Sequence, residues 1–146
     1  MRVNGTWMPC EDGETRPVIR IDVQSAAGQM IAADFLVDTG ADRSAFDTNL
    51  LQQLELPPQP PPPALSLQGI GGVSPFVIVE TLLQLPREDG GVANIKGQFA
   101  AFTDPKAIDL CILGRDVLQH FDVIVSRRRN QVLLLAANHE YVVKTN

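Results

Sequence analysis

The chain has 146 residues, a formal net charge of −5 and a hydrophobic fraction of 45%, which is enough for one domain with a sizeable core and no disulfide framework. An acidic chain lacks the basic face that phosphate binding requires, so a broad nucleic-acid interface is not expected. Because no apolar stretch reaches the length of a membrane span and residues 1–16 lack the apolar centre of a signal peptide, we expect a soluble, cytoplasmic protein that does not bind membranes.

The first predicted elements form a β-hairpin. In "VIRIDVQ" (18–24), Ile19, Ile21 and Val23 alternate with polar residues, which is the pattern of a half-buried strand. The turn-forming stretch "SAAGQ" follows. A second strand, "MIAADFLV" (30–37), then leads directly into Asp38.

One short helix is predicted next, over residues 47–56, where Leu50, Leu51 and Leu54 recur at helical spacing and Asp47 or Thr48 can cap the start. The proline run 57–63 follows it. Proline has no N–H to donate to a sheet, so this run is interpreted as a stiff extended connector. A docking segment for a proline-reading module is the alternative.

The rest of the chain is predicted to be mostly strands. Two alternating strands flank the glycines of residues 69–72, and residues 94–102 form another. An apolar strand containing Cys111, interpreted as a small buried hydrophobe, leads into a short helix with Val117, Leu118 and Phe121. Further strands are expected at 122–125, 131–137 and 140–145, and Arg127, Arg128 and Arg129 are interpreted as a solvated hairpin turn between two of them. The fold class is all-β, a small closed or nearly closed barrel with one or two short helices.

Asp38 is the candidate for chemistry, because a lone buried charge is costly and is kept only for a purpose. The alternative is a turn aspartate that caps the helix after it. Three features occur in order: Asp-Thr-Gly at a strand end ("FLVDTGAD"), a glycine-rich hairpin tip ("LQGIGG") and an apolar strand that ends in "ILGRDVL".

Together these motifs resemble the retroviral-type aspartic proteases, the retropepsins and their cellular and bacterial relatives, over roughly residues 17–126. The resemblance implies a retropepsin-like barrel that forms a homodimer and acts as an aspartic endopeptidase on peptide or protein substrates. Asp38 would face the same residue of a second subunit. The pair would share one proton and activate a water molecule, so that no metal or cofactor is needed.

The resemblance also implies roles for the neighbouring residues. Thr39 would hydrogen-bond across the dimer axis, Gly40 would allow close approach, and Asp42 would form an intrachain ion pair with Arg115 through a bidentate contact that braces the loop. The predicted catalytic residues are Asp38, Thr39 and Gly40; the predicted substrate-binding residues are Ala41, Asp42, Gly69, Ile70, Gly71, Gly72 and Ile112; the predicted supporting residues are Gly114 and Arg115. Residues 69–72 would be the flap that closes over a bound peptide.

We divide the chain into an N-terminal extension (1–16), a retropepsin-like domain (17–135) and a C-terminal tail (136–146) that is a candidate interface strand. The extension is longer than in the viral members, and an extra strand, a disordered arm and a segment removed by self-cleavage all fit it. The alternative function is a peptide-binding or assembly module of the same fold that does not hydrolyse its ligand.

Overall fold

The computed structural model describes residues 1–63, 68–69, 72–136, 140, 142 and 144. Its strands are β1 (Arg2–Asn4), β2 (Thr6–Pro9), β3 (Thr15–Gln24), β4 (Met30–Val37), β5 (Ala45–Phe46), β6 (Gln68–Gly69), β7 (Gly72–Val73), β8 (Phe76–Pro86), β9 (Val92–Phe102), β10 (Cys111–Leu113), β11 (Asp122–Ser126) and β12 (Gln131–Leu135). Its helices are α1 (Thr48–Leu54) and α2 (Arg115–Leu118). The described part of the chain is therefore all-β with two short helices, as predicted.

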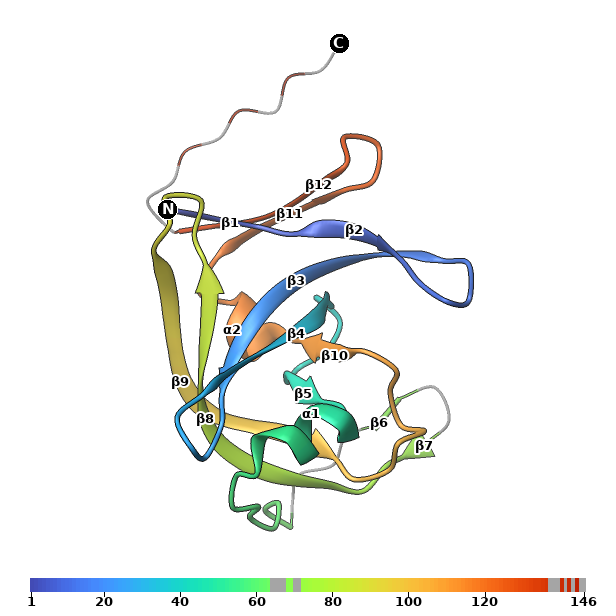
Figure 1. Cartoon of the computed structure of the whole chain (residues 1–146). Helices are drawn as coiled ribbons and strands as arrows, with labels where there is room; N and C mark the ends of the chain where they lie inside the picture. Colours follow the sequence, from blue (N-terminus) through green and yellow to red (C-terminus); the bar gives the residue numbers. More distant parts are fainter. Residues whose placement is uncertain (64–67, 70–71, 137–139, 141, 143, 145–146) are drawn as a thin grey trace.

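The strands form a barrel with a smaller sheet beside it (Figure 1). The seven-stranded sheet has the order β2-β3-β4-β10-β5-β9-β8, and a further pairing between β3 and β8 closes it. The smaller sheet has the order β1-β12-β11. Its strands lie at the end of the molecule where the N-terminus is found, and the long β8–β9 hairpin wraps around one side of the barrel.

The hairpin of β3 and β4 forms as the alternating pattern predicted. The two strands pair from Val18 with Leu36 to Gln24 with Met30, and β4 ends at Val37, directly before Asp38. Gly28 has a φ of 85°, a value that favours glycine, in the turn between them. The alternating apolar residues point into the barrel, so the pairing register places Asp38 at a defined edge of the core.

The N-terminal segment forms two additional strands. β1 pairs with β12 and β2 pairs with β3. The indole Nε1 of Trp7 donates to the carbonyl of Ser126 at 3.1 Å, and the guanidinium of Arg127 lies 5.5 Å from the centre of the Trp7 ring. Because Arg127 belongs to the turn that joins β11 and β12, the predicted basic hairpin turn is confirmed and also contacts the N-terminal strand.

Helix α1 is capped by Asp47, whose Oδ1 accepts a hydrogen bond from the N–H of Leu50 at 2.8 Å, so Asp38 is not the cap. The helix ends at Leu54, two residues before the predicted end.

The proline run 57–63 was predicted to be an unpaired connector, and the structure differs from this at one residue. Gln59 has the N–H that its neighbours lack, and it exchanges backbone hydrogen bonds of 2.8 and 2.9 Å with Ile78 of β8.

The core is centred on aromatic residues. Phe46 stacks on Phe99 at a ring separation of 5.6 Å and meets Phe35 edge-on at 5.8 Å.

In the C-terminal part of the chain, α2 stops at Leu118, so Phe121 lies beyond the helix that was predicted to carry it. The strand predicted over 140–145 and the tail 136–146 fall largely outside the described residues. Within the described part of the chain, no helix has the length and apolar character needed to cross a membrane.

Thiol reagents are expected to label Cys10 in the native protein and Cys111 only after unfolding. Cys111 is 2% exposed, and its burial raises the pKa of the thiol to about 12, so almost no reactive thiolate forms near pH 8. The unfolded thiol ionises near its ordinary pKa of 9.0 while the folded one stays protonated. The contribution of this group to stability is therefore complete below about pH 9 and is lost between about pH 9 and 12. Timed labelling with and without urea, read by mass spectrometry, tests this; equal labelling of both cysteines in the native protein would contradict it.

Candidate functional site

Asp38 is positioned by a parallel pair of strands. β10 runs alongside β4, with Ile112 opposite Leu36 and Leu113 opposite Val37. The N–H of Asp38 then donates to the carbonyl of Leu113 at 3.1 Å. Since both strands end at the same edge of the sheet, the segments that follow them, 38–44 and 114–118, must lie together.

The carboxylate of Asp38 is half-buried and only partly engaged. Its Oδ1 accepts a hydrogen bond from the N–H of Gly40 at 3.0 Å, and its main-chain carbonyl accepts one from the N–H of Ala41 at 3.2 Å. These contacts hold the turn. Within the described part of the chain the second oxygen, Oδ2, has no hydrogen-bond partner, and the adjacent Thr39 and Gly40 are exposed.

Arg115 and Asp42 form the predicted ion pair, but not through a bidentate contact. One guanidinium nitrogen, Nη2, contacts Asp42, while the other, Nη1, donates to the carbonyl of Thr39 at 3.3 Å. The two side chains of the pair are 56% and 80% exposed, so the pair contributes little stability. Backbone hydrogen bonds link the two segments instead: Arg115 N–H to the carbonyl of Ala41 at 2.8 Å, and Asp116 N–H to the carbonyl of Asp42 at 3.2 Å.

A second link between the segments was not predicted from the sequence. Ser44 is fully buried, and its Oγ donates to Oδ1 of Asp116 at 2.7 Å and accepts from the N–H of Gly114 at 3.0 Å. The same Oδ1 also accepts from the N–H groups of Ser44 and Val117, each at 2.9 Å. A buried serine whose hydroxyl both donates and accepts a hydrogen bond holds the loop after Asp38 against α2. The signal in the sequence was a hydroxyl residue directly before the buried pair Ala45 and Phe46.

Gly114 is required by close packing of two backbones. A Cβ atom added at this position would lie 2.5 Å from the carbonyl carbon and 2.6 Å from the carbonyl oxygen of Arg43. The φ of Gly114 is −97°, which any residue adopts, so contact distance and not backbone conformation selects glycine here.

The predicted substrate-binding residues are only partly described. Ile112 is half-buried and packs against a small cluster formed by Ala45, Phe76, Ile78, Ala100 and Phe102. Gly69 and Gly72 are paired across the β6–β7 hairpin. Ile70 and Gly71, at the predicted flap tip, lie outside the described residues. Gly69 and Gly72 thus lie on a short hairpin, and the assignment of residues 69–72 as a flap stays a prediction.

The described residues contain no group of three His, Cys, Asp or Glu side chains arranged to hold a metal ion, and His120 is exposed. The chemistry available is that of a half-buried carboxylate. An ionised carboxylate can take a proton from water, but hydrolysis of an amide also requires a proton donor for the leaving amine. The sequence contains one Asp-Thr-Gly, at residues 38–40.

Comparison with known proteins identifies similar sequences and structures. Residues 22–117 match the family model described as aspartyl protease. The EIAV protease, solved in complex with the inhibitor HBY-793, is 23% identical, with a TM-score of 0.53 and coverage of 75% of this chain and 91% of that one. A retropepsin-like aspartic protease from Rickettsia conorii is 15% identical, with a TM-score of 0.59 and coverage of 92% and 89%. At these identities the two structures show the fold alone, and no curated protein matches the chain.

Proposed function

This chain belongs to the retropepsin-like aspartic protease family, and from that membership we propose that it is a homodimeric endopeptidase that cleaves peptide bonds between two Asp38 carboxylates. The family match spans the Asp38 loop, the β6–β7 hairpin and the Gly114–Arg115 turn. The observation that carries the proposal is the position of Asp38, on a braced turn at the end of a buried strand with one carboxylate oxygen open.

The proposal requires a second copy of the chain. The exposed Thr39 and Gly40 beside Asp38 leave room for a partner on the same surface. An isologous dimer would place two Asp38 residues face to face across its two-fold axis. Two carboxylates that face each other within hydrogen-bonding reach share one proton, as the pair in aspartic proteases does, because their like charges prevent both from being ionised together.

Because one proton is shared, the two Asp38 carboxylates have different roles in the reaction. The ionised Asp38 takes a proton from the water held between the two carboxylates, and that water attacks the scissile carbonyl. The protonated Asp38 gives its proton to the carbonyl oxygen as the tetrahedral intermediate forms. The Asp38 that took a proton from water then passes it to the leaving amine, and the other Asp38 regains a proton from a hydroxyl of the intermediate as the C–N bond breaks. The substrate lies extended beneath the β6–β7 hairpin, whose glycine backbone hydrogen-bonds it.

A diverse peptide library, incubated with the purified chain from about pH 3 to pH 7 and analysed by mass spectrometry, tests the proposal. We expect discrete cleavage products and an activity per chain that rises with protein concentration until the dimer is saturated. Two results would contradict the proposal: no cleavage at concentrations where sedimentation shows a dimer, or an activity per chain that does not change on dilution into monomer. Binding of peptides without cleavage would favour the peptide-binding module.

A further inference from the structure

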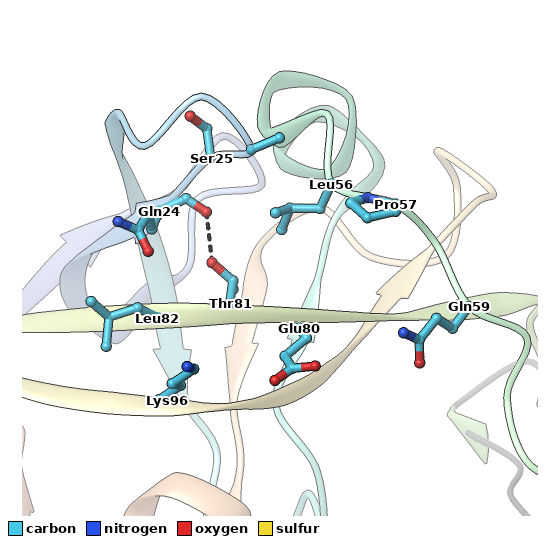
Figure 2. A pocket seen from close by; sticks show the side chains of 10 residues that line it. Gln24, Ser25, Leu56, Pro57, Gln59, Glu80, Thr81, Leu82 and Lys96 are labelled. Atoms are coloured by element: carbon cyan, nitrogen blue, oxygen red, sulfur yellow. Dashed lines mark hydrogen bonds between the residues drawn. The ribbon is translucent and has the colours of Figure 1, made fainter.

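A second site is a pocket of about 590 Å³, shown in Figure 2. It is lined by Gln24, Ser25, Ala26, Leu56, Pro57, Gln59, Glu80, Thr81, Leu82 and Lys96. Gln24 pairs with Met30, the first residue of β4, whereas Asp38 follows the last. At roughly 3.3 Å per residue, the eight residues of β4 separate the pocket from Asp38 by about 26 Å.

The pocket opens where, among the described residues, one edge of β8 has no partner strand. Gln59 bonds that edge at Ile78, and β3 pairs with it again at Leu83. Alternate residues of a strand direct their N–H and C=O groups to the same edge, so those of Glu80 face the gap. The antiparallel register from Gln59 would place Pro57 opposite Glu80, but proline has no N–H to donate.

The pocket contains one acid and one base that are not paired with each other. Glu80 lies opposite Gln98 and Lys96 opposite Leu82, which makes Glu80 and Lys96 diagonal neighbours on the outer face of the β8–β9 hairpin. Diagonal Cβ atoms are separated by about 7–8 Å. Among the described residues, neither side chain takes part in an ion pair.

Apolar and amide groups complete the lining. Leu82 is half-buried and lies opposite Lys96 in the strand pairing, and Leu56 stands across the pocket in the segment that follows α1 (Figure 2). The hydroxyl of Thr81 is already used, because it donates to the carbonyl of Gln24 at 2.6 Å (Figure 2). The site thus combines an apolar wall with a small number of convergent polar groups, as ligand sites commonly do.

We infer that this pocket binds a short peptide with free ends. The amino group of the peptide contacts the carboxylate of Glu80, and the carboxylate of the peptide contacts the ammonium of Lys96. An apolar side chain of the peptide packs against Leu56 and Leu82. A ligand that pairs with both Glu80 and Lys96 must carry a positive and a negative group, separated by about as much as the two side chains are. An extended chain gains roughly 3.5 Å per residue, so two or three residues reach that separation. The site does not depend on hydrolysis at Asp38.

The tripeptide Ala-Leu-Ala, titrated into the full chain at neutral pH and followed by calorimetry, tests this inference. We expect saturable binding that weakens at least about tenfold in Glu80→Gln and in Lys96→Gln, since a charge-assisted contact is lost in each. The N-acetylated and the C-amidated tripeptides each lack one charge, so each should bind the wild type as weakly as the unmodified tripeptide binds these two variants. The matched control, Lys106→Gln, removes an exposed charge outside the pocket and should leave binding unchanged.

Three results would overturn the inference. One is no saturable binding at about 10 mM tripeptide, tenfold above a millimolar dissociation constant. Another is equal affinity in the wild type and in Glu80→Gln and Lys96→Gln. The third is loss of binding in Asp38→Asn, which would place the peptide in the Asp38 site. Unchanged binding in Asp38→Asn supports the pocket, and it does so whether or not the chain hydrolyses peptides.

Discussion

Replacing Asp38 by asparagine is expected to lower kcat/KM for peptide hydrolysis by at least about 10³-fold, within the range that a positioned acid and base contribute. An amide cannot take a proton from water, and two facing amides cannot share one. The Oδ1 of asparagine can still accept the hydrogen bond that Gly40 N–H donates to Asp38, so the turn should keep its shape. The measurement is the initial rate on a peptide that the wild type cleaves, at matched dimer concentration.

Asp34→Asn is the matched control for this substitution. Asp34 lies on β4, the strand that leads into Asp38, and its carboxylate pairs with Arg20 on the surface at 3.2 Å. Exposed pairs of this kind contribute about 0–1 kcal/mol, so the variant should retain its fold and its activity. If Asp38→Asn kept more than about a tenth of the wild-type rate, the carboxylate would not be the acid and base of the reaction.

Replacing Gly114 by alanine is expected to destabilise the protein by about 3 kcal/mol, at the upper end of the usual cost of overpacking. The added Cβ would lie 2.5 Å from the carbonyl carbon of Arg43 and 2.9 Å from the N–H nitrogen of Ser44. Both atoms belong to the backbone, so no side chain can move aside to relieve the contact. The loop after Asp38 must shift, and hydrolysis should therefore fall by more than the loss of folded protein explains.

Gly97→Ala is the control, because Gly97 lies within a strand, β9, where an added Cβ has room. There the nearest atom to an added Cβ is 3.5 Å away, at the edge of the Phe99 ring, which is an ordinary contact. A glycine within a strand carries an entropic cost of roughly 0.5–1 kcal/mol relative to alanine, so this variant should be neutral or slightly more stable. Urea unfolding of both variants measures the difference. Gly114→Ala within about 0.5 kcal/mol of the wild type would show that the two backbones separate easily.

Several elements could be predicted because their causes are local. The alternation of Ile19, Ile21 and Val23 gave the hairpin of β3 and β4, and the spacing of Leu50 and Leu54 after Asp47 gave α1 with its cap. The position of Asp38 at the end of a strand followed from the apolar pattern of residues 30–37. Each of these signals depends on residues a few positions apart, which is the range over which periodicity and capping act.

Contacts between distant residues could not be predicted in this way. Ser44 and Asp116 are 72 residues apart, and Trp7 and Ser126 are 119 apart, so no local pattern announces either hydrogen bond. The bridge from Gln59 to Ile78 depends on which residue of a proline run the barrel brings to the edge of β8.

The sequence by itself determined the class of fold, the end of the strand at which Asp38 lies, and the resemblance through which the family was recognised. Only the tertiary structure decided how Asp38 is braced. Backbone hydrogen bonds and the buried Ser44 hold the loop, whereas the predicted ion pair of Asp42 and Arg115 lies in water and adds little. The physical reason is that the strength of a polar contact depends on its burial, and burial is set by how distant segments of the chain pack together.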